Sequence, residues 1–204
     1  MDIFAYRIIP VVVLDNAADA EPLGEALLAG GLPLAEVTFR TDAAAEAISI
    51  LSEMEGLTVG AGTVVCPDQV ELAIEAGAQF IVSPGLRADV LQEATLAGKP
   101  VLPGAVTPTE LLTAQTLGID TVKFFPADAF GGPSAIKALS APFPGMRFVP
   151  TGGVSPKNLA DYLAIPAVPA VGGSWMVKSD LIAAQAFDKI AALARQAVEL
   201  ANSL

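Results

Sequence analysis

The chain has 204 residues, of which 53% are hydrophobic and 16% charged, a composition typical of a globular domain with a large apolar core. Its 11 basic and 22 acidic residues give a formal net charge of −11, which argues against a nucleic-acid-binding surface. There is no histidine, and Cys66 is the single cysteine. The sequence therefore excludes catalytic histidines, histidine-based zinc sites and an intrachain disulfide.

Short apolar runs alternate along the chain with Ala- and Glu-rich segments of helical periodicity. The predicted strands cover residues 8–14, 34–39, 57–61, 79–83, 100–103, 121–125, 147–151 and 167–172. The predicted helices cover residues 17–29, 42–54, 67–76, 87–97, 107–117, 133–140, 155–163 and 180–201. Eight successive units of this kind indicate an α/β protein and specifically a (β/α)₈ TIM barrel, as a single compact domain over residues 1–204. An open doubly wound sheet is the alternative, but no G-x-G-x-x-G motif follows the first strand.

The beginning of the chain has no basic region followed by an apolar stretch and a small-residue cleavage site, as a signal peptide would. No segment of the sequence is long and apolar enough to span a bilayer. We therefore expect a cytoplasmic protein with no membrane partner and no nucleic-acid partner.

The segment TVKFFPA, residues 121–127, places Lys123 inside an apolar strand. Lysine is almost never fully buried without a partner, and burial disfavours its charged form. A neutral lysine amine can attack a carbonyl carbon and form a Schiff base. The alternative is a lysine on an edge strand whose amine extends to solvent.

Period-two alternation predicts which strand residues face the interior of the barrel. In strand 34–39, Glu36, Thr38 and Arg40 fall on one face, and the same rule sends Lys123 inward from strand 121–125. Strands two and six lie across a barrel from each other, so Glu36 and Lys123 can meet at its mouth. A strand with one solvated face is the alternative. Because a purely structural buried ion pair adds little stability, we favour a catalytic pair.

Two glycine-rich turns follow the seventh and eighth predicted strands, at residues 150–154 and 171–175. Glycines let backbone N–H groups approach an anion closely, and barrel enzymes often bind phosphate at this position. Each turn taken alone is more often a plain turn, but the two together favour a phosphate site. Thr63, at the end of the third strand, is either a further ligand contact or a helix cap.

Together these segments resemble the class I aldolases that cleave 2-keto-3-deoxy-6-phosphogluconate (KDPG), a family that also handles 4-hydroxy-2-oxoglutarate (KHG). The resemblance covers nearly the whole chain. The motifs that carry it are PVVV at 10–13, EVTFRT at 36–41, GAGTV at 60–64, SPG at 83–85, LPG at 102–104, VKFFPA at 122–127, PTGG at 150–153 and GGSW at 172–175. Residues 105–109 differ in detail from the family, which affects loop contacts more than the chemistry.

The resemblance implies that Lys123 is the Schiff-base lysine and that Glu36 is the general acid/base. It further implies that Arg40 and Thr63 bind the carboxylate of the pyruvate moiety and that Phe125 packs against the substrate. The implied phosphate site comprises Thr151, Gly152, Gly153 and Ser174.

By the same resemblance, the partners are pyruvate and a phosphorylated 2-keto sugar acid, and the reaction yields pyruvate and glyceraldehyde 3-phosphate without a metal or another cofactor. Family members are (β/α)₈ barrels that assemble as homotrimers. Three alternatives stay open. They are an aldolase for the 6-phosphogalactonate isomer, a phosphate-binding barrel isomerase or synthase, and a non-catalytic sugar-phosphate-binding barrel.

Overall fold

The computed structural model describes residues 2–204, in which strands and helices alternate as predicted. The strands are β1 (Ile8–Val12), β2 (Leu34–Thr38), β3 (Thr58–Gly62), β4 (Phe80–Val82), β5 (Val101–Leu102), β6 (Thr121–Phe124), β7 (Arg147–Pro150) and β8 (Val171–Gly173). The helices are the 3₁₀ turn η1 (Ala17–Asp19), then α1 (Ala20–Ala29), α2 (Ala44–Ser52), α3 (Pro67–Glu75), α4 (Ala88–Leu96), α5 (Pro108–Thr116), α6 (Gly132–Ser140), α7 (Leu159–Leu163), α8 (Ser179–Ala183) and α9 (Phe187–Asn202). No helix formed by residues 2–204 has the length and apolarity needed to cross a bilayer.

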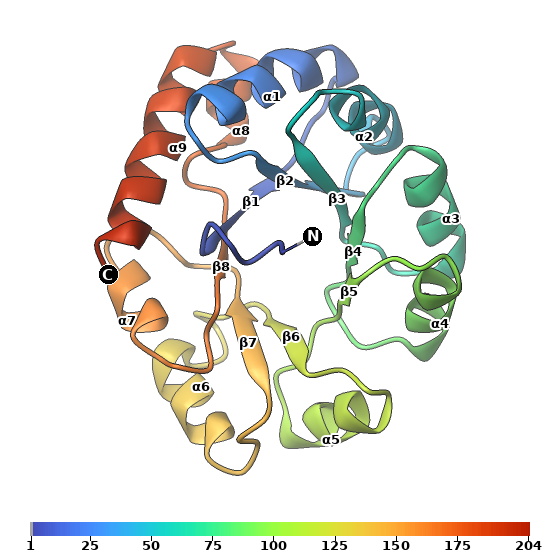
Figure 1. The fold of residues 1–204 in the computed structure, drawn as a ribbon, viewed down its shortest axis with the longest axis vertical. Helices are drawn as coiled ribbons and strands as arrows, with labels where there is room; N and C mark the ends of the chain where they lie inside the picture. The colour runs from blue at the N-terminus through green and yellow to red at the C-terminus, as the bar shows by residue number, and fades with distance from the viewer. Residues whose placement is uncertain (1) are drawn as a thin grey trace.

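The strands surround a common centre with the helices outside them (Figure 1). A six-stranded parallel sheet with the order β5-β4-β3-β2-β1-β8 forms a half-barrel, and β6 and β7 pair in a separate parallel sheet. The predicted single-domain α/β fold with parallel strands is therefore confirmed.

The ladder of hydrogen-bonded strands is not continuous, so regular pairing gives a six-stranded half-barrel and a two-stranded sheet rather than the single eight-stranded ladder expected of the predicted barrel. Single parallel bridges span the two seams, one between Gly104 and Lys123 and one between Thr151 and Gly172. The reason is the length of the bordering strands, since β5 has two residues and β8 has three. Pro103 also follows β5 directly and has no backbone N–H to donate to a ladder.

Side-chain alternation separates two apolar clusters. Val37, Val122 and Phe124 pack in the larger cluster together with helix residues, as expected for strand positions that alternate with the inward-facing Glu36 and Lys123. A smaller cluster fills the space enclosed by the strands: Ile3, Ile9, Leu34, Phe80, Val82, Leu102 and Val149, with Phe4 packed against it. The N-terminal segment crosses the centre of the ring of strands (Figure 1) and contributes Ile3 and Phe4 to this inner cluster. The strands thus enclose a packed apolar core, and the buried polar residues Glu36 and Lys123 belong to the same ring of strands.

The single long helix predicted at 180–201 is wrong, because α8 and α9 are separate helices. Between them Gln185 has a φ of 53°, a left-handed conformation that ends a right-handed helix. The backbone N–H of Ala186 donates to the carbonyl of Leu181 at 2.9 Å, which closes the turn. No glycine marks this position in the sequence, so the pattern gave no signal for the break.

Candidate active site

Lys123 and Glu36 meet inside the ring of strands, as the alternation predicted. Nζ of Lys123, on β6, donates to Oε1 of Glu36, on β2, at 2.7 Å. The two residues are 4% and 1% exposed, so the alternative of a lysine extending to solvent from an edge strand is wrong. A buried amine hydrogen-bonded to a buried carboxylate can exchange its proton with that carboxylate without involving solvent.

Gly62 on β3 provides the space that Glu36 occupies. A Cβ atom at Gly62 would lie 2.4 Å from Oε1 of Glu36, and one at Gly60 would lie 2.3 Å from the ring of Phe80. The two glycines of the GAGTV motif therefore make room for the side chains of the neighbouring strands. This role was not predicted from the sequence. A glycine at an inward-facing strand position, next to a strand with a large inward-facing side chain, can indicate such a close approach.

Arg40 and Thr63 lie together where β2 and β3 end. Nε of Arg40 donates to Oγ1 of Thr63 at 3.2 Å, and Thr63 has a φ of 58°, which is rare for a β-branched residue. Arg40 is exposed and Thr63 is half-buried, so both remain accessible to a ligand. Strained backbone of this kind is found preferentially at functional sites.

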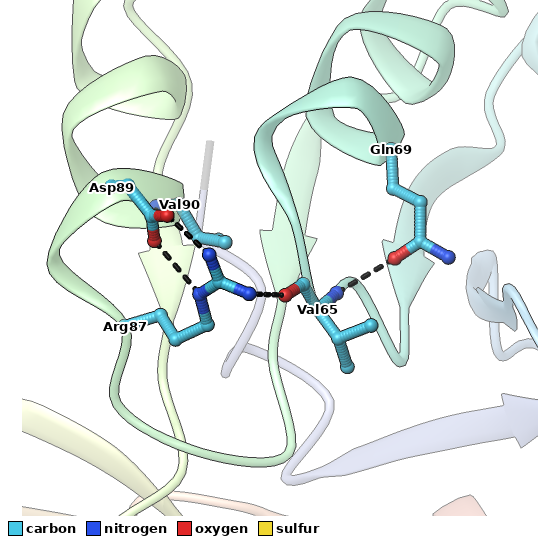
Figure 2. Close-up of polar contacts among 5 residues, drawn as sticks. All are labelled: Val65, Gln69, Arg87, Asp89 and Val90. Carbon is cyan, nitrogen blue, oxygen red and sulfur yellow. Dashed lines mark hydrogen bonds and ion pairs between the residues drawn. The ribbon is translucent and has the colours of Figure 1, made fainter.

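The loop that carries Thr63 is fixed from both sides through Val65 (Figure 2). The Val65 N–H donates to Oε1 of Gln69 at 2.7 Å, and its carbonyl accepts from Nη1 of Arg87, also at 2.7 Å. The Arg87 guanidinium is in turn held by Asp89, and this hydrogen bond keeps the pKa of the Asp89 carboxyl below its ordinary value. The pair is solvent-exposed, so we expect it to orient the loop rather than to add much stability. No pattern in the sequence predicted this role for Val65, Gln69, Arg87 or Asp89.

A cavity of about 380 Å³ extends from Arg40 to the two glycine-rich turns. Its lining is Val11, Val13, Arg40, Phe125, Thr151, Gly152, Gly153, Val154, Gly172, Gly173, Ser174, Val177, Lys178 and Ser179. Six of the nine predicted site residues are thus brought to one cavity. Phe125 connects it to the buried pair, because its ring centroid lies 5.6 Å from Nζ of Lys123. Glu36, Lys123 and Thr63 do not themselves line it.

The glycine-rich turns contribute four residues without side chains to the cavity lining, namely Gly152, Gly153, Gly172 and Gly173. Gly152 and Gly153 have φ angles of 91° and 83°, a conformation that other residues rarely adopt. A Cβ atom at Gly172 would lie 2.2 Å from Oγ1 of Thr151, so the absence of a side chain there lets the two strands approach. Ser174 is exposed beside these glycines. Backbone N–H groups and a hydroxyl in such a turn can hold an anion.

Within residues 2–204, no three His, Cys, Asp or Glu side chains come together as a metal site would require. The charged and polar groups of this site are instead an amine, a carboxylate, a guanidinium and hydroxyls.

Parallel strands with outer helices, and a buried lysine–carboxylate pair beside a cavity with an arginine and glycine turns, define the class of lyases that cleave carbon–carbon bonds as aldolases. The sequence comparison identifies the family. Residues 3–193 match the aldolase family described as "KDPG and KHG aldolase", and the chain belongs to it.

Known relatives agree over almost the entire chain. It is 46% identical over 193 residues to the KHG/KDPG aldolase of Escherichia coli (strain K12), covering 94% of this chain and 91% of that protein. The KDPG aldolase of Legionella pneumophila, solved with pyruvate captured at low pH as a covalent carbinolamine intermediate, is 40% identical with a TM-score of 0.92 and 95% coverage of both chains. The KDPG aldolase of Zymomonas mobilis ZM4, solved with 3-phosphoglycerate, is 42% identical with a TM-score of 0.88, covering 96% of this chain and 94% of that one.

Proposed function

We propose that this protein cleaves KDPG to pyruvate and glyceraldehyde 3-phosphate through a Schiff base on Lys123, and that it also cleaves KHG to pyruvate and glyoxylate. The observation that carries the proposal is the buried 2.7 Å contact between Nζ of Lys123 and Oε1 of Glu36. The carbinolamine trapped in the Legionella relative supports covalent attachment of pyruvate in this family.

The first step requires a neutral amine. The proton that Lys123 shares with Glu36 passes to the carboxylate, and the free amine then attacks the C2 carbonyl carbon of the substrate. The carbinolamine formed in this way loses water, which leaves a protonated imine. Glu36 is the proton donor for the departing hydroxyl, and in this step it returns to the carboxylate form.

The protonated imine then accepts the electron pair of the bond that breaks. Glu36 removes the proton from the C4 hydroxyl, the C3–C4 bond breaks, and the electrons of that bond form an enamine on Lys123. The aldehyde product, glyceraldehyde 3-phosphate, leaves. Protonation of the enamine at C3 by Glu36, followed by hydrolysis of the imine, releases pyruvate and restores the lysine.

The two ends of the substrate fit the two ends of the cavity. Arg40 presents a planar guanidinium beside the Thr63 hydroxyl, a combination suited to the C1 carboxylate. The phosphate would lie against the N–H groups of Gly152 and Gly153 and the hydroxyl of Ser174, with Thr151 behind them. Phe125 would cover the substrate between these two sites.

We infer that the two sheets together form one closed (β/α)₈ barrel, joined at its seams by the single bridges. The two seams between the sheets fall at site residues, since Lys123 bridges to Gly104 and Thr151 bridges to Gly172. The backbone N–H of Lys123 also donates to Pro103 at 2.8 Å, and the N–H of Phe148 donates to Ala167 at 2.8 Å. These bonds support a closed ring of eight strands that fixes Lys123 opposite Glu36.

We also infer a homotrimer. Exposed apolar side chains occur on three successive helices, with Leu72 on α3, Leu96 on α4 and Leu112 on α5. These three helices are neighbours in the outer ring (Figure 1), and we propose that the side of the molecule they form is the subunit contact. Light scattering during size-exclusion chromatography tests the assembly, and a monomeric mass would contradict it.

Intact-mass spectrometry after addition of pyruvate and sodium borohydride tests the Schiff base directly. We expect a stable adduct on the wild-type protein and none on the Lys123→Ala variant. No adduct on correctly folded wild-type protein would contradict the aldolase mechanism and would favour a phosphate-binding barrel isomerase or synthase, or a non-catalytic sugar-phosphate-binding barrel. Cleavage of the 6-phosphogalactonate isomer in preference to KDPG would instead assign the substrate of the other branch.

A further inference from the structure

The cavity contains a cation that the proposed reaction does not use. Among the described residues that line it, Arg40 and Lys178 are charged and none is acidic. Arg40 is engaged with Thr63, following β3, whereas Lys178 lies in the segment that follows β8, four residues beyond Ser174. A protein with a net charge of −11 repels a phosphorylated substrate. A local cation at this end of the cavity would offset that repulsion where the phosphate binds.

The backbone of Lys178 is fixed although its side chain is exposed. Met176 and Val177, just before it, are buried, and the N–H of Val177 donates to the carbonyl of Ser174 at 3.1 Å. The carbonyl of Lys178 accepts from the N–H groups of Leu181 and Ile182 at 3.0 and 3.1 Å. The amine is therefore attached to a well-anchored backbone four residues from Ser174.

No carboxylate neutralises this amine. Lys178 takes part in no ion pair in the described part of the chain. The nearby carboxylate of Asp180 instead accepts from the N–H of Leu181 at 2.9 Å. Asp128 packs against Gly153 but is not among the residues that line the cavity. The charge of Lys178 is thus available to an anion in the cavity.

We propose that Lys178 determines specificity for phosphorylated substrates by placing its ammonium group beside the phosphate held at Gly152, Gly153 and Ser174. This inference rests on the proposed function for the position of the phosphate. A lysine acts on phosphate as a point charge, so its effect extends to the approach of the substrate as well as to the bound state. KHG has no phosphate, and its distal carboxylate lies close to the bond that breaks, so it should not depend on Lys178.

The Lys178→Met variant tests this proposal because methionine keeps much of the length of the side chain and removes its charge. We expect KM for KDPG to rise about tenfold, which corresponds to the loss of one charge-assisted hydrogen bond, while kcat stays the same. Turnover of KHG should change less than about twofold. Lys189→Met, which replaces an exposed lysine on α9 that does not line the cavity, serves as the matched control and should leave both reactions unchanged.

Calorimetric titration with 3-phosphoglycerate tests the same residue without any turnover. Wild-type protein should bind it about tenfold more tightly than Lys178→Met, and added salt should weaken wild-type binding more steeply. The proposed role of Lys178 would be overturned if the wild type and Lys178→Met bound 3-phosphoglycerate equally well, or if the wild type did not bind it. It would also be overturned if Lys178→Met lost equal activity on KDPG and KHG. Failure of pyruvate trapping would instead overturn the proposed function. The titration would still show whether Lys178 binds the phosphate group.

Discussion

Gly62 and Glu36 are matched in shape, since a Cβ atom on Gly62 would lie 2.4 Å from Oε1 and 2.6 Å from Cγ of Glu36. Thr38, two residues further along β2, pairs in register with Gly62, so the glycine stands beside the strand that carries the carboxylate. Glu36 has space to reach Lys123 only because β3 offers no side chain there. The position of the carboxylate is therefore set by a neighbouring strand as well as by its own.

We expect Gly62→Ala to displace the Glu36 carboxylate from Lys123 and to lower kcat by about 10²-fold, at the lower end of the contribution of a positioned acid or base. Gly145→Ala is the matched control, because Gly145 has no atom within 4 Å of an added Cβ and lies in the loop before β7. Steady-state kinetics on KDPG, with thermal unfolding of both variants, measure the effect. Wild-type turnover by a folded Gly62→Ala protein would mean that Glu36 tolerates displacement.

Replacement of the two members of the buried pair should separate covalent attachment from proton transfer. Lys123→Ala should abolish turnover and borohydride trapping, since Lys123 supplies the amine that is paired with Glu36. Glu36→Gln still offers an oxygen that accepts a hydrogen bond from Lys123 but can no longer take or return its proton, so the adduct should form more slowly than on the wild type and turnover should fall by about 10²–10⁴-fold. Trapping and kcat are measured on the same preparations, and a Glu36→Gln protein with full activity would remove Glu36 from the mechanism.

The sequence predicted the contact between Glu36 and Lys123 because period-two alternation and the opposition of strands two and six are local and topological rules. The two Gly-Gly pairs after the seventh and eighth strands predicted the glycine-rich turns that line the cavity. Strand alternation and barrel topology do not predict the contacts made by loop residues. Arg87 reaches Val65 from 22 residues away through a side-chain hydrogen bond, and no periodicity encodes such a contact. The break at Gln185 likewise depends on a left-handed residue that is not glycine.

The capping box at the start of α5 should make a measurable contribution to stability. Oγ1 of Thr107 accepts from the N–H of Glu110 at 3.3 Å, and the Glu110 carboxylate accepts from the N–H of Thr107 at 2.8 Å. We expect Thr107→Ala to lower the free energy of unfolding by about 1 kcal/mol. Chemical denaturation measures this change, and Thr109→Ala, in the first turn of the same helix, is the control.

The contribution of Glu110 should depend on pH. Burial alone would raise the pKa of its carboxyl. Hydrogen bonds from the Val106 N–H, the Thr107 hydroxyl and the Thr107 N–H together outweigh this effect, so the pKa lies below the ordinary value of 4.5. A group with a lowered folded-state pKa stabilises the protein above its unfolded pKa, and this stabilisation is lost as the pH falls. The cost of Glu110→Gln should therefore be larger at neutral pH than in acid, and a cost independent of pH would contradict this.

Arg40 and Thr63 give a prediction about substrate binding rather than chemistry. Lysine at position 40 would keep the positive charge but lose both the planar fork and the Nε bond to Oγ1 of Thr63. Because the substrate carboxylate is held equally before and during bond cleavage, Arg40→Lys should raise KM by about tenfold or more with little change in kcat. The rate of pyruvate trapping at low pyruvate concentration should fall in parallel. If KM were unchanged while kcat fell, Arg40 would act on the reacting atoms and not on the carboxylate.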